Sequence, residues 1–584
     1  MSKTNKKTGR SIVTDDASRA FLATLGRWTG GLSPQAFGGA WISVLARLAT
    51  APGRQAQMAR SALQKSLALA QFAGTAVRSG GIAPEAAGTP YQSRFSDPAW
   101  AKFPFNVLAQ SFLTASDWAR EAVTNVPGAQ ASAENIVGFT VREGLELVAP
   151  DNYLPTNPQL IGKTIEENGR NLVRGAKHLA EDVVRTFRGQ GPAGIENYTV
   201  GEQVAATKGK VILRTPLMEL IQYSPQTPTV YAEPVLIVPA WIMKYYILDL
   251  SPKNSLVNYL TGLGHTVFMI SWKNPTAEDR DITMDDYLGH GVLAALDAVT
   301  AIVPKRKVHA VGYCIGGTLL GIAAAALAAR DDERLASVTM FAAQTDFSEP
   351  GELSIFISPA QLAMLEALMW KEGVLESRQM GGAFQLLRTY DLLWAPTIGT
   401  YLRGERMGLN DLMAWNADGT RMAYRMHTDY LHQLYLNNDL AEGRYVALGE
   451  EISLSDVTVP MFVVGTETDH VAPWRSVYKV GKLVRSADYT FCLTSGGHNA
   501  GIISGPQHPK RRHRVLQTKA GARLTSPDRY MEKVEPMPGS WWPTWAKWLE
   551  ERSAARKVPP PSMGAPKKGL KPICDAPGTY VKQK

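Results

Sequence analysis

Cys314 lies in a pattern that suits a catalytic nucleophile. The segment Gly312–Gly317 reads GYCIGG, follows a short apolar run at 308–311 and precedes an apolar stretch that we expect to be helical from about Thr318. A tight turn from a buried strand into a helix holds its central side chain on strained backbone, and glycines two residues away on each side leave room for it. The turn also points the helix N-terminus at the sulfur, which favours a thiolate. We therefore predict a nucleophile elbow with Cys314 in place of serine.

An elbow nucleophile needs an acid and then a base, in that order along the chain. Asp469 follows the apolar run at 461–464, and His498 follows the run at 489–492 in a glycine-rich loop. Both come at the carboxyl ends of predicted strands, where open α/β sheets meet their ligands. We predict the triad Cys314, Asp469 and His498. The alternatives are Glu467 and Asp346 for the acid, and His265, His290, His309 and His470 for the base.

Two backbone amides should stabilise the oxyanion formed during attack at Cys314. One is the amide of Ile315, the residue after the nucleophile, and the other follows the apolar run at 235–238. Pro239 has no N–H, so Ala240 or Trp241 must donate, and we predict Trp241.

A cysteine nucleophile favours acyl transfer over simple hydrolysis. Attack by a thiol on a thioester exchanges one thioester for another at little net free energy, so the acyl group stays activated for a second transfer. A serine would form a more stable oxyester and lose that activation. Some hydrolases of this fold also use cysteine, so a polyester or acyl-CoA thioester hydrolase remains the alternative.

The elements that must position these residues alternate along the second half of the chain. Continuous apolar runs separated by helical stretches indicate a parallel sheet covered on both faces. With the elbow, they predict the α/β-hydrolase fold. A Met- and Trp-rich helical interval at about 348–458 breaks the alternation and is expected to form a cap. The six runs are 235–238, 266–270, 308–311, 338–341, 461–464 and 489–492.

Three regions differ in their sequence pattern. Residues 1–90 form an N-terminal extension, partly disordered or helical, with one amphipathic helix expected over 56–78. Residues 91–207 form a largely helical N-terminal domain. Residues 208–584 form the catalytic domain with its cap insertion.

Composition limits the compartment and the partners. The formal charge is +9, gathered in Lys3, Lys6, Lys7 and Arg10, in residues 510–514 and in the tail after Arg552. Solvated tails and a solvated loop explain these clusters better than a nucleic-acid site, and a basic surface also attracts coenzyme A. Three cysteines form neither a disulfide framework nor a metal-ligand pattern, which favours a reducing compartment. We found no signal peptide and no membrane span, and we expect a cytoplasmic protein.

Between Gln92 and Val581 the sequence resembles class I polyhydroxyalkanoate synthases, which make storage polyester. The resemblance rests on several specific motifs. They are GYCIGGT at 312–318, IVPAWI at 237–242, YILDL at 246–250, GHTVF at 264–268, SWKNP at 271–275, DHVAPW at 469–474, GHNAG at 497–501, GSWWP at 539–543 and DNYLPTNP at 151–158.

The resemblance implies an acyltransferase that uses the triad Cys314, His498 and Asp469. It implies polymerisation of short-chain (R)-3-hydroxyacyl-CoA, such as 3-hydroxybutyryl-CoA, with release of coenzyme A and with no metal or other cofactor. It also implies a homodimer that lies on polyester granules, with an N-terminal domain that contacts the granule and granule-associated proteins. A looser match suggests Arg388 as a contact for a coenzyme A phosphate. A non-catalytic granule-coat protein is a further alternative, against which the complete triad argues.

Overall fold

A large mixed sheet forms the centre of the molecule. Over the described residues, 15–84 and 90–584 of the computed structural model, this sheet has eleven strands in the order β14-β13-β12-β11-β6-β5-β3-β4-β2-β1-β15. Its six central strands run parallel to one another and confirm the six predicted runs. They are β3 Val235–Val238, β4 Val267–Trp272, β5 Val308–Tyr313, β6 Leu335–Phe341, β11 Met461–Thr466 and β12 Asp488–Thr494.

The margins of the sheet are antiparallel, so the predicted parallel sheet is limited to the six central strands. β2 (Met218–Tyr223), β1 (Gly209–Arg214) and β15 (Cys574–Asp575) extend one side. β13 (Arg512–Lys519) and β14 (Met537–Pro538) extend the other. The basic cluster at 510–514 is therefore not a solvated loop, because β13 begins within it and buries His513. An antiparallel strand at a sheet margin usually alternates apolar and polar residues. In β13 the clustered arginines make this alternation hard to recognise in the sequence.

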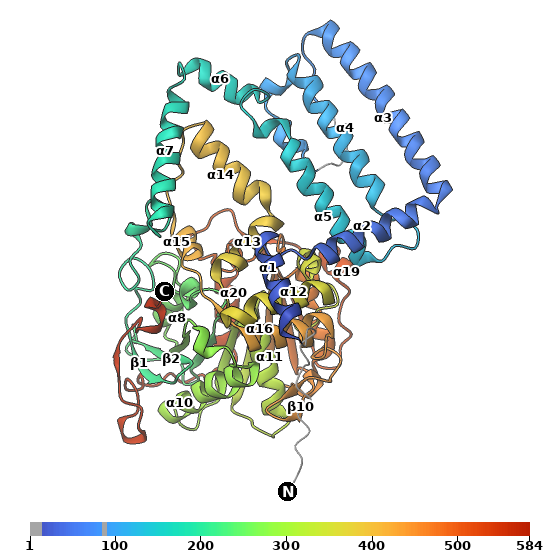
Figure 1. The fold of residues 1–584 in the computed structure, drawn as a ribbon. Coiled ribbons are helices and arrows are strands. Elements are labelled where there is room, and N and C mark those ends of the chain that lie inside the picture. Colours follow the sequence, from blue (N-terminus) through green and yellow to red (C-terminus); the bar gives the residue numbers. More distant parts are fainter. Residues whose placement is uncertain (1–14, 85–89) are drawn as a thin grey trace.

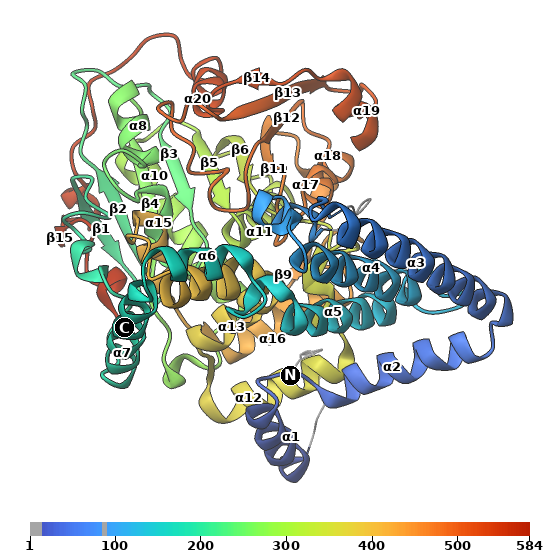
Figure 2. The same cartoon turned by 90° about the horizontal axis from the view of Figure 1, so that it is seen from above.

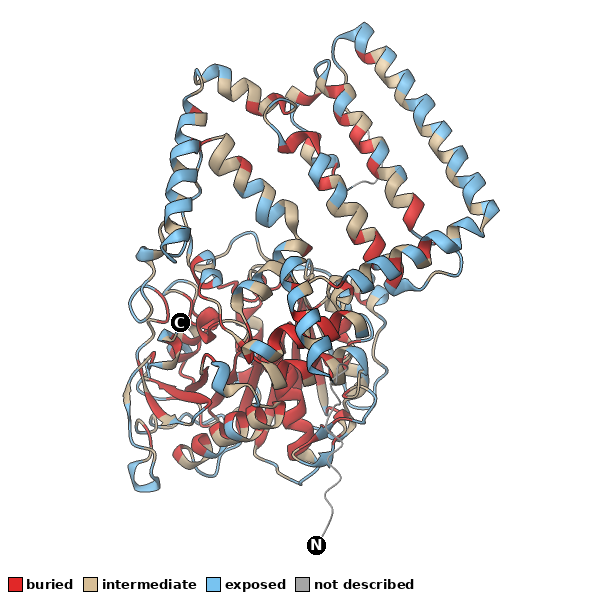
Figure 3. Cartoon of the chain, in the orientation of Figure 1, coloured by how far each residue is buried: buried red, intermediate tan, exposed pale blue. Residues whose placement is uncertain are grey.

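Helices cover the sheet, and buried residues gather in the sheet and in the helices next to it (Figure 3). α11 (Ile315–Ala328) follows the elbow and is buried along almost its whole length. It begins at Ile315, three residues earlier than the predicted start near Thr318, because the elbow passes directly from strand into helix. α8 (Leu256–Leu263), α10 (Ala294–Ile302) and α20 (Trp542–Glu550) complete the layers. The α/β-hydrolase fold class is confirmed.

A helical cap fills the interval between β6 and β11. α12 (Pro359–Glu372) begins at the side-chain cap of Ser358 and ends at Gly373, whose positive φ suits glycine. The other cap helices are α13 Ser377–Leu387, α14 Ala395–Thr397, α15 Asp411–Ala417 and α16 Tyr424–Tyr430. The short strands β7 (Val374–Leu375) and β8 (Met422–Ala423) pair within the cap.

The N-terminal helices stand beside the cap. α3, α4 and α5 lie side by side above the sheet domain, and α1 lies against α12 (Figures 1 and 2). The predicted helix at 56–78 is confirmed within α3. The basic residues Lys3, Lys6, Lys7 and Arg10 fall outside the described residues. None of the helices described is both long enough and apolar enough to cross a membrane. The bounds are α1 Asp16–Trp28, α2 Pro34–Ala49, α3 Pro52–Ser79, α4 Phe105–Val123, α5 Ala131–Val148, α6 Pro158–Glu166 and α7 Arg170–Phe187.

A buried carboxylate in the sheet domain makes stability depend on pH. Burial raises the pKa of Asp249 to about 6, although the hydroxyls of Ser255 and Thr207 donate to it. The unfolded chain ionises this group near pH 4, so the folded state binds the extra proton between about pH 4 and pH 6. The free energy of unfolding therefore falls as pH rises through that window, by about 3 kcal/mol in all.

We expect Asp249→Asn to remove this pH-dependent fall in the free energy of unfolding, because the amide stays neutral. Its melting temperature relative to the native protein should rise between about pH 4 and pH 6. Melting curves at a series of pH values test this, and an offset that does not change with pH contradicts it.

Candidate active site

The backbone at Cys314 is strained as an elbow requires. Cys314 has φ 54° and ψ −129°, between the end of β5 and the start of α11. A Cβ atom on Gly312 would collide with Gly317, and one on Gly316 would collide with the carbonyl oxygens of Val238 and Pro239. Glycine is thus required at both positions by close backbone approach, as the sequence predicted.

The other two cysteines have the environment of structural thiols. Burial raises the pKa of Cys492, which lies inside β12. Burial and the nearby Glu219 raise the pKa of Cys574 at the sheet margin. Cys314 is partly exposed and lines a cavity. Cys574 is also partly exposed, but among the described cysteines only Cys314 lines this cavity, as a nucleophile must to reach a substrate.

His498 lies between Cys314 and Asp469. Its Nδ1 is 2.8 Å from Oδ2 of Asp469, and the side chain of Cys314 is near enough to raise its pKa. Burial by itself lowers the pKa of His498, but the charges of Asp469 and Cys314 reverse this and hold the pKa well above its usual range. The structure therefore brings the three predicted residues together in the order acid, base and nucleophile.

Both carboxylate oxygen atoms of Asp469 accept hydrogen bonds, as expected of an orienting residue. Oδ2 accepts from His498 and from the hydroxyl of Thr466 at 2.9 Å. Oδ1 accepts from the amides of Val471 at 2.9 Å and Ala472 at 2.8 Å. Burial opposes ionisation, but His498 and the two amides lower the pKa of Asp469. Its side chain has no exposed surface, so it can act on a substrate only through His498.

The alternative acids and bases have other partners. Glu467 forms an ion pair with Arg512 at 2.6 Å, and Asp346 accepts from Ser348 and Asn438. His265 stacks on Tyr231, and His309 bonds to Ser337 and Ser553. His290 is largely exposed near Asp286. His470 is next to Asp469 in sequence, and burial together with the charge of Arg388 lowers its pKa.

The two predicted oxyanion residues lie on different elements, Ile315 directly after the nucleophile and Trp241 on the loop after β3. Ile315 is the first residue of α11, so its amide is one of the N–H groups that a helix leaves without an intrahelical partner. Trp241 is buried on the loop after β3, where its ring stacks on Tyr287 at 4.4 Å. The next residue, Ile242, lines the same cavity as Cys314 and Ile315.

Arg511 supports the loop that carries His498, a role that sequence reasoning missed. Its guanidinium donates to the carbonyl oxygens of Ser495 at 3.3 Å and Ala500 at 2.8 Å, on either side of His498. The basic cluster in the sequence suggested only solvated charge. The sequence does not show which of the neighbouring basic residues is partly buried, so Arg511 could not be singled out.

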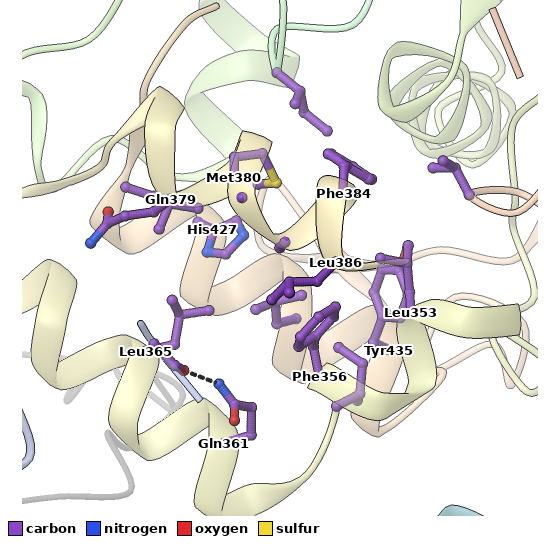
Figure 4. A pocket seen from close by; sticks show the side chains of 18 of the residues that line it. Leu353, Phe356, Gln361, Leu365, Gln379, Met380, Phe384, Leu386, His427 and Tyr435 are labelled. Atoms are coloured by element: carbon purple, nitrogen blue, oxygen red, sulfur yellow. Dashed lines mark hydrogen bonds between the residues drawn. The ribbon is translucent and has the colours of Figure 1, made fainter. Parts of the chain in front are cut away.

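A cavity of about 660 Å³ opens beside Cys314 (Figure 4). Its walls are mainly apolar and come from the cap, from the elbow and from the N-terminal segment. Figure 4 shows Leu353, Phe356, Leu365, Met380, Phe384 and Leu386 around it. A volume of this size is typical of a pocket that encloses a small organic ligand, about 300–1,000 Å³.

The turn at Gly30–Leu32, between α1 and α2, forms part of the cavity wall. The amide group of Gln361, on cap helix α12, makes two hydrogen bonds to this turn. Its Nε2 donates to the carbonyl oxygen of Gly31 at 2.6 Å, and its Oε1 accepts from the amide of Ser33 at 2.8 Å. Arg27 adds an ion pair with Glu372 at 3.2 Å. The N-terminal segment thus belongs to the catalytic cavity, although it lies almost three hundred residues from Cys314 in sequence.

We expect Gln361→Met to reduce turnover severalfold. The change removes both hydrogen bonds and frees the Gly30–Leu32 turn, while the side chain keeps its length. Steady-state kinetics on an acyl-CoA substrate measure the effect. Gln55→Met is the matched control, because Gln55 bonds to the carbonyl oxygens of Leu48 and Ala49 away from the cavity. Equal losses in the two variants would mean that the Gln361 contacts act only on general stability.

Three family descriptions match segments of the chain. Residues 15–54 match "Poly-beta-hydroxybutyrate polymerase N terminal", and residues 91–260 match "Poly-beta-hydroxybutyrate polymerase (PhaC) N-terminus". Residues 233–503 match "alpha/beta hydrolase fold".

Several proteins named as polymerases are similar over most of the chain. The poly(3-hydroxyalkanoate) polymerase of Methylorubrum extorquens is 40% identical over 85% of this chain and 81% of its own length. The poly(3-hydroxyalkanoate) polymerase subunit PhaC of Rhizobium meliloti is 37% identical over 84% of this chain and 79% of its own. The corresponding subunit of Cupriavidus necator is 33% identical over 86% of this chain and 84% of its own.

Proposed function

Because this chain belongs to the poly(3-hydroxyalkanoate) polymerase family, we propose that it polymerises 3-hydroxyacyl-CoA thioesters into polyester through a covalent thioester on Cys314. The observation that carries the proposal is the grouping of Cys314 with His498, which is itself bonded to Asp469, at the wall of a mainly apolar cavity. We propose short-chain (R)-3-hydroxyacyl groups, such as 3-hydroxybutyryl, as substrates.

The first half-reaction loads the acyl group onto the enzyme. His498 takes the thiol proton, and the sulfur of Cys314 attacks the thioester carbonyl carbon. The amides of Ile315 and Trp241 are the proposed donors to the oxyanion. The bond to the sulfur of coenzyme A then breaks, and His498 returns its proton to that sulfur, so that coenzyme A leaves as a free thiol.

The second half-reaction extends the chain. His498 removes the proton from the 3-hydroxyl of a second acyl-CoA, whose oxygen attacks the carbonyl carbon of the Cys314 thioester. An ester bond forms, the sulfur of Cys314 leaves, and it recovers a proton from His498. The lengthened chain is now a coenzyme A thioester, which reloads onto Cys314 with release of coenzyme A.

The remaining assignments are proposals of the same kind. Arg388 lies at the end of α13, near His470, where its charge suits a coenzyme A phosphate. We propose a homodimer in the cytoplasm, bound to the polyester granule and to granule-associated proteins, with contacts from the helical region 91–207.

One assay separates this function from its alternatives. The purified protein is incubated with 3-hydroxybutyryl-CoA, and free thiol and insoluble polyester are both measured. Polymerisation predicts that both rise together. Thiol release with free 3-hydroxybutyrate and no polymer would instead indicate a hydrolase, and no thiol release would indicate a non-catalytic protein.

A further inference from the structure

Two buried polar residues line the mainly apolar cavity, and each has one side-chain nitrogen without a partner in the described part of the chain. Gln344 and His427 are each only 4% exposed, and both line the cavity that contains Cys314. Nε2 of Gln344 and Nδ1 of His427 have no hydrogen-bond partner among the described residues. A buried polar atom left unpaired costs about 1–3 kcal/mol, so such groups usually have a ligand or another partner.

The two side chains lie on different parts of the structure. Gln344 follows β6, and its backbone carbonyl accepts from the hydroxyl of Thr318 on α11 at 2.7 Å. Gln344 is therefore bonded to α11, the helix that begins directly after the elbow. His427 lies on cap helix α16, beside Met380 in Figure 4. A ligand bonded to both would be held between the sheet domain and the cap.

The chemistry of the two groups suits an ester. The amide nitrogen of Gln344 is a donor, and a neutral imidazole offers one donor and one acceptor. Burial lowers the pKa of His427 to about 4, so the ring is neutral at neutral pH. A polyester of 3-hydroxy acids carries carbonyl acceptors separated by short apolar spacers, which match two donors in a mainly apolar cavity.

We propose that Gln344 and His427 form a subsite that binds ester carbonyl groups of the growing chain, and so determine how well the enzyme extends it. The subsite rests on the proposed polymerase function. It would act after loading, since the first acyl group carries no ester bond. The pantetheine arm of coenzyme A also has carbonyl groups, and the experiment below separates the two ligands.

The test compares loading with extension in Gln344→Met and His427→Phe. Rapid quench gives the rate of acylation of Cys314 by 3-hydroxybutyryl-CoA, and a trimer of 3-hydroxybutyrate as its coenzyme A thioester gives the rate of extension. We expect extension to fall about tenfold in each variant, the effect of one buried hydrogen bond, while loading by the monomer changes less than about twofold. His427→Gln, which keeps a donor, should recover part of the extension rate.

Thr345→Val is the matched control. Thr345 is buried next to Gln344 with an unpartnered Oγ1, but it does not line the cavity, so this variant should extend normally. Native extension in both cavity variants overturns the subsite. A rise in KM for monomeric acyl-CoA in parallel with the loss of extension also overturns it, because the groups would then bind the pantetheine arm. Failure of the native protein to acylate Cys314 would refute the polymerase function itself.

Discussion

Replacing Cys314 with alanine should lower release of coenzyme A by roughly 10⁴-fold or more, the scale of loss when a catalytic nucleophile is removed. The sulfur is the atom that receives the acyl group, and no other described cysteine lines the cavity. Alanine keeps the Cβ atom and is smaller, so the elbow should still form with φ near 54°. Thiol release measures the loss, and an unchanged melting temperature shows that the fold is intact.

Two controls accompany this variant. Cys574→Ala should remain active, because this residue lies in the marginal strand β15. Cys492→Ala should also remain active, with a modest loss of stability from the small cavity it leaves in β12. Normal turnover by Cys314→Ala, or inactivity of either control in a folded protein, would show that the nucleophile has been assigned wrongly.

The second large effect is expected at Asp469 and His498. His498→Gln removes the base for both half-reactions and should reduce loading and extension together. In Asp469→Asn, an amide nitrogen that replaces Oδ2 would face Nδ1 of His498 and favour the tautomer with its proton on Nε2. That tautomer cannot take the proton of the attacking hydroxyl, so we expect extension to fall by about 10⁴-fold, the scale of loss when an orienting carboxylate is changed in this way.

Asp469 could act in extension in two ways, by activating the hydroxyl directly or by tuning His498. Its four hydrogen bonds and lack of exposed surface favour the second role. Because a thiolate depends less on an orienting carboxylate than serine does, loading should suffer less than extension in Asp469→Asn. Rapid-quench measurement of the acyl-enzyme and of extension gives both rates.

Glu467→Gln is the matched control, since this rival acid pairs with Arg512 and not with His498. It should keep nearly native activity. If Glu467→Gln abolished turnover while Asp469→Asn did not, the acid would be Glu467 and the observed hydrogen bonds of Asp469 would be structural only.

Local sequence patterns predicted the central strands and the triad because both depend on neighbouring residues. The continuous apolar run at 235–238 matches β3, in which every residue is buried. The elbow depends on glycines within two residues of Cys314. Asp469 and His498 could be placed because the ends of parallel strands meet at one edge of a sheet.

The cavity could not be predicted, because its walls depend on contacts between distant segments. Gln361, Gln344 and His427 have no local pattern that distinguishes them from other polar residues in or near helices. The turn at Gly30–Leu32 reaches the cavity only because α1 packs on α12. The antiparallel margin at β13 was missed for a different reason, since charged side chains on its exposed face masked a strand.

The most direct test of the account is to detect the acyl group on the enzyme. The native protein is mixed with 3-hydroxybutyryl-CoA, quenched in acid within the first turnover and analysed by peptide mass spectrometry. The account predicts a 3-hydroxybutyryl thioester on the peptide that contains Cys314, absent from Cys314→Ala. Rapid turnover with the acyl group on another residue, or with no covalent adduct at all, would contradict it.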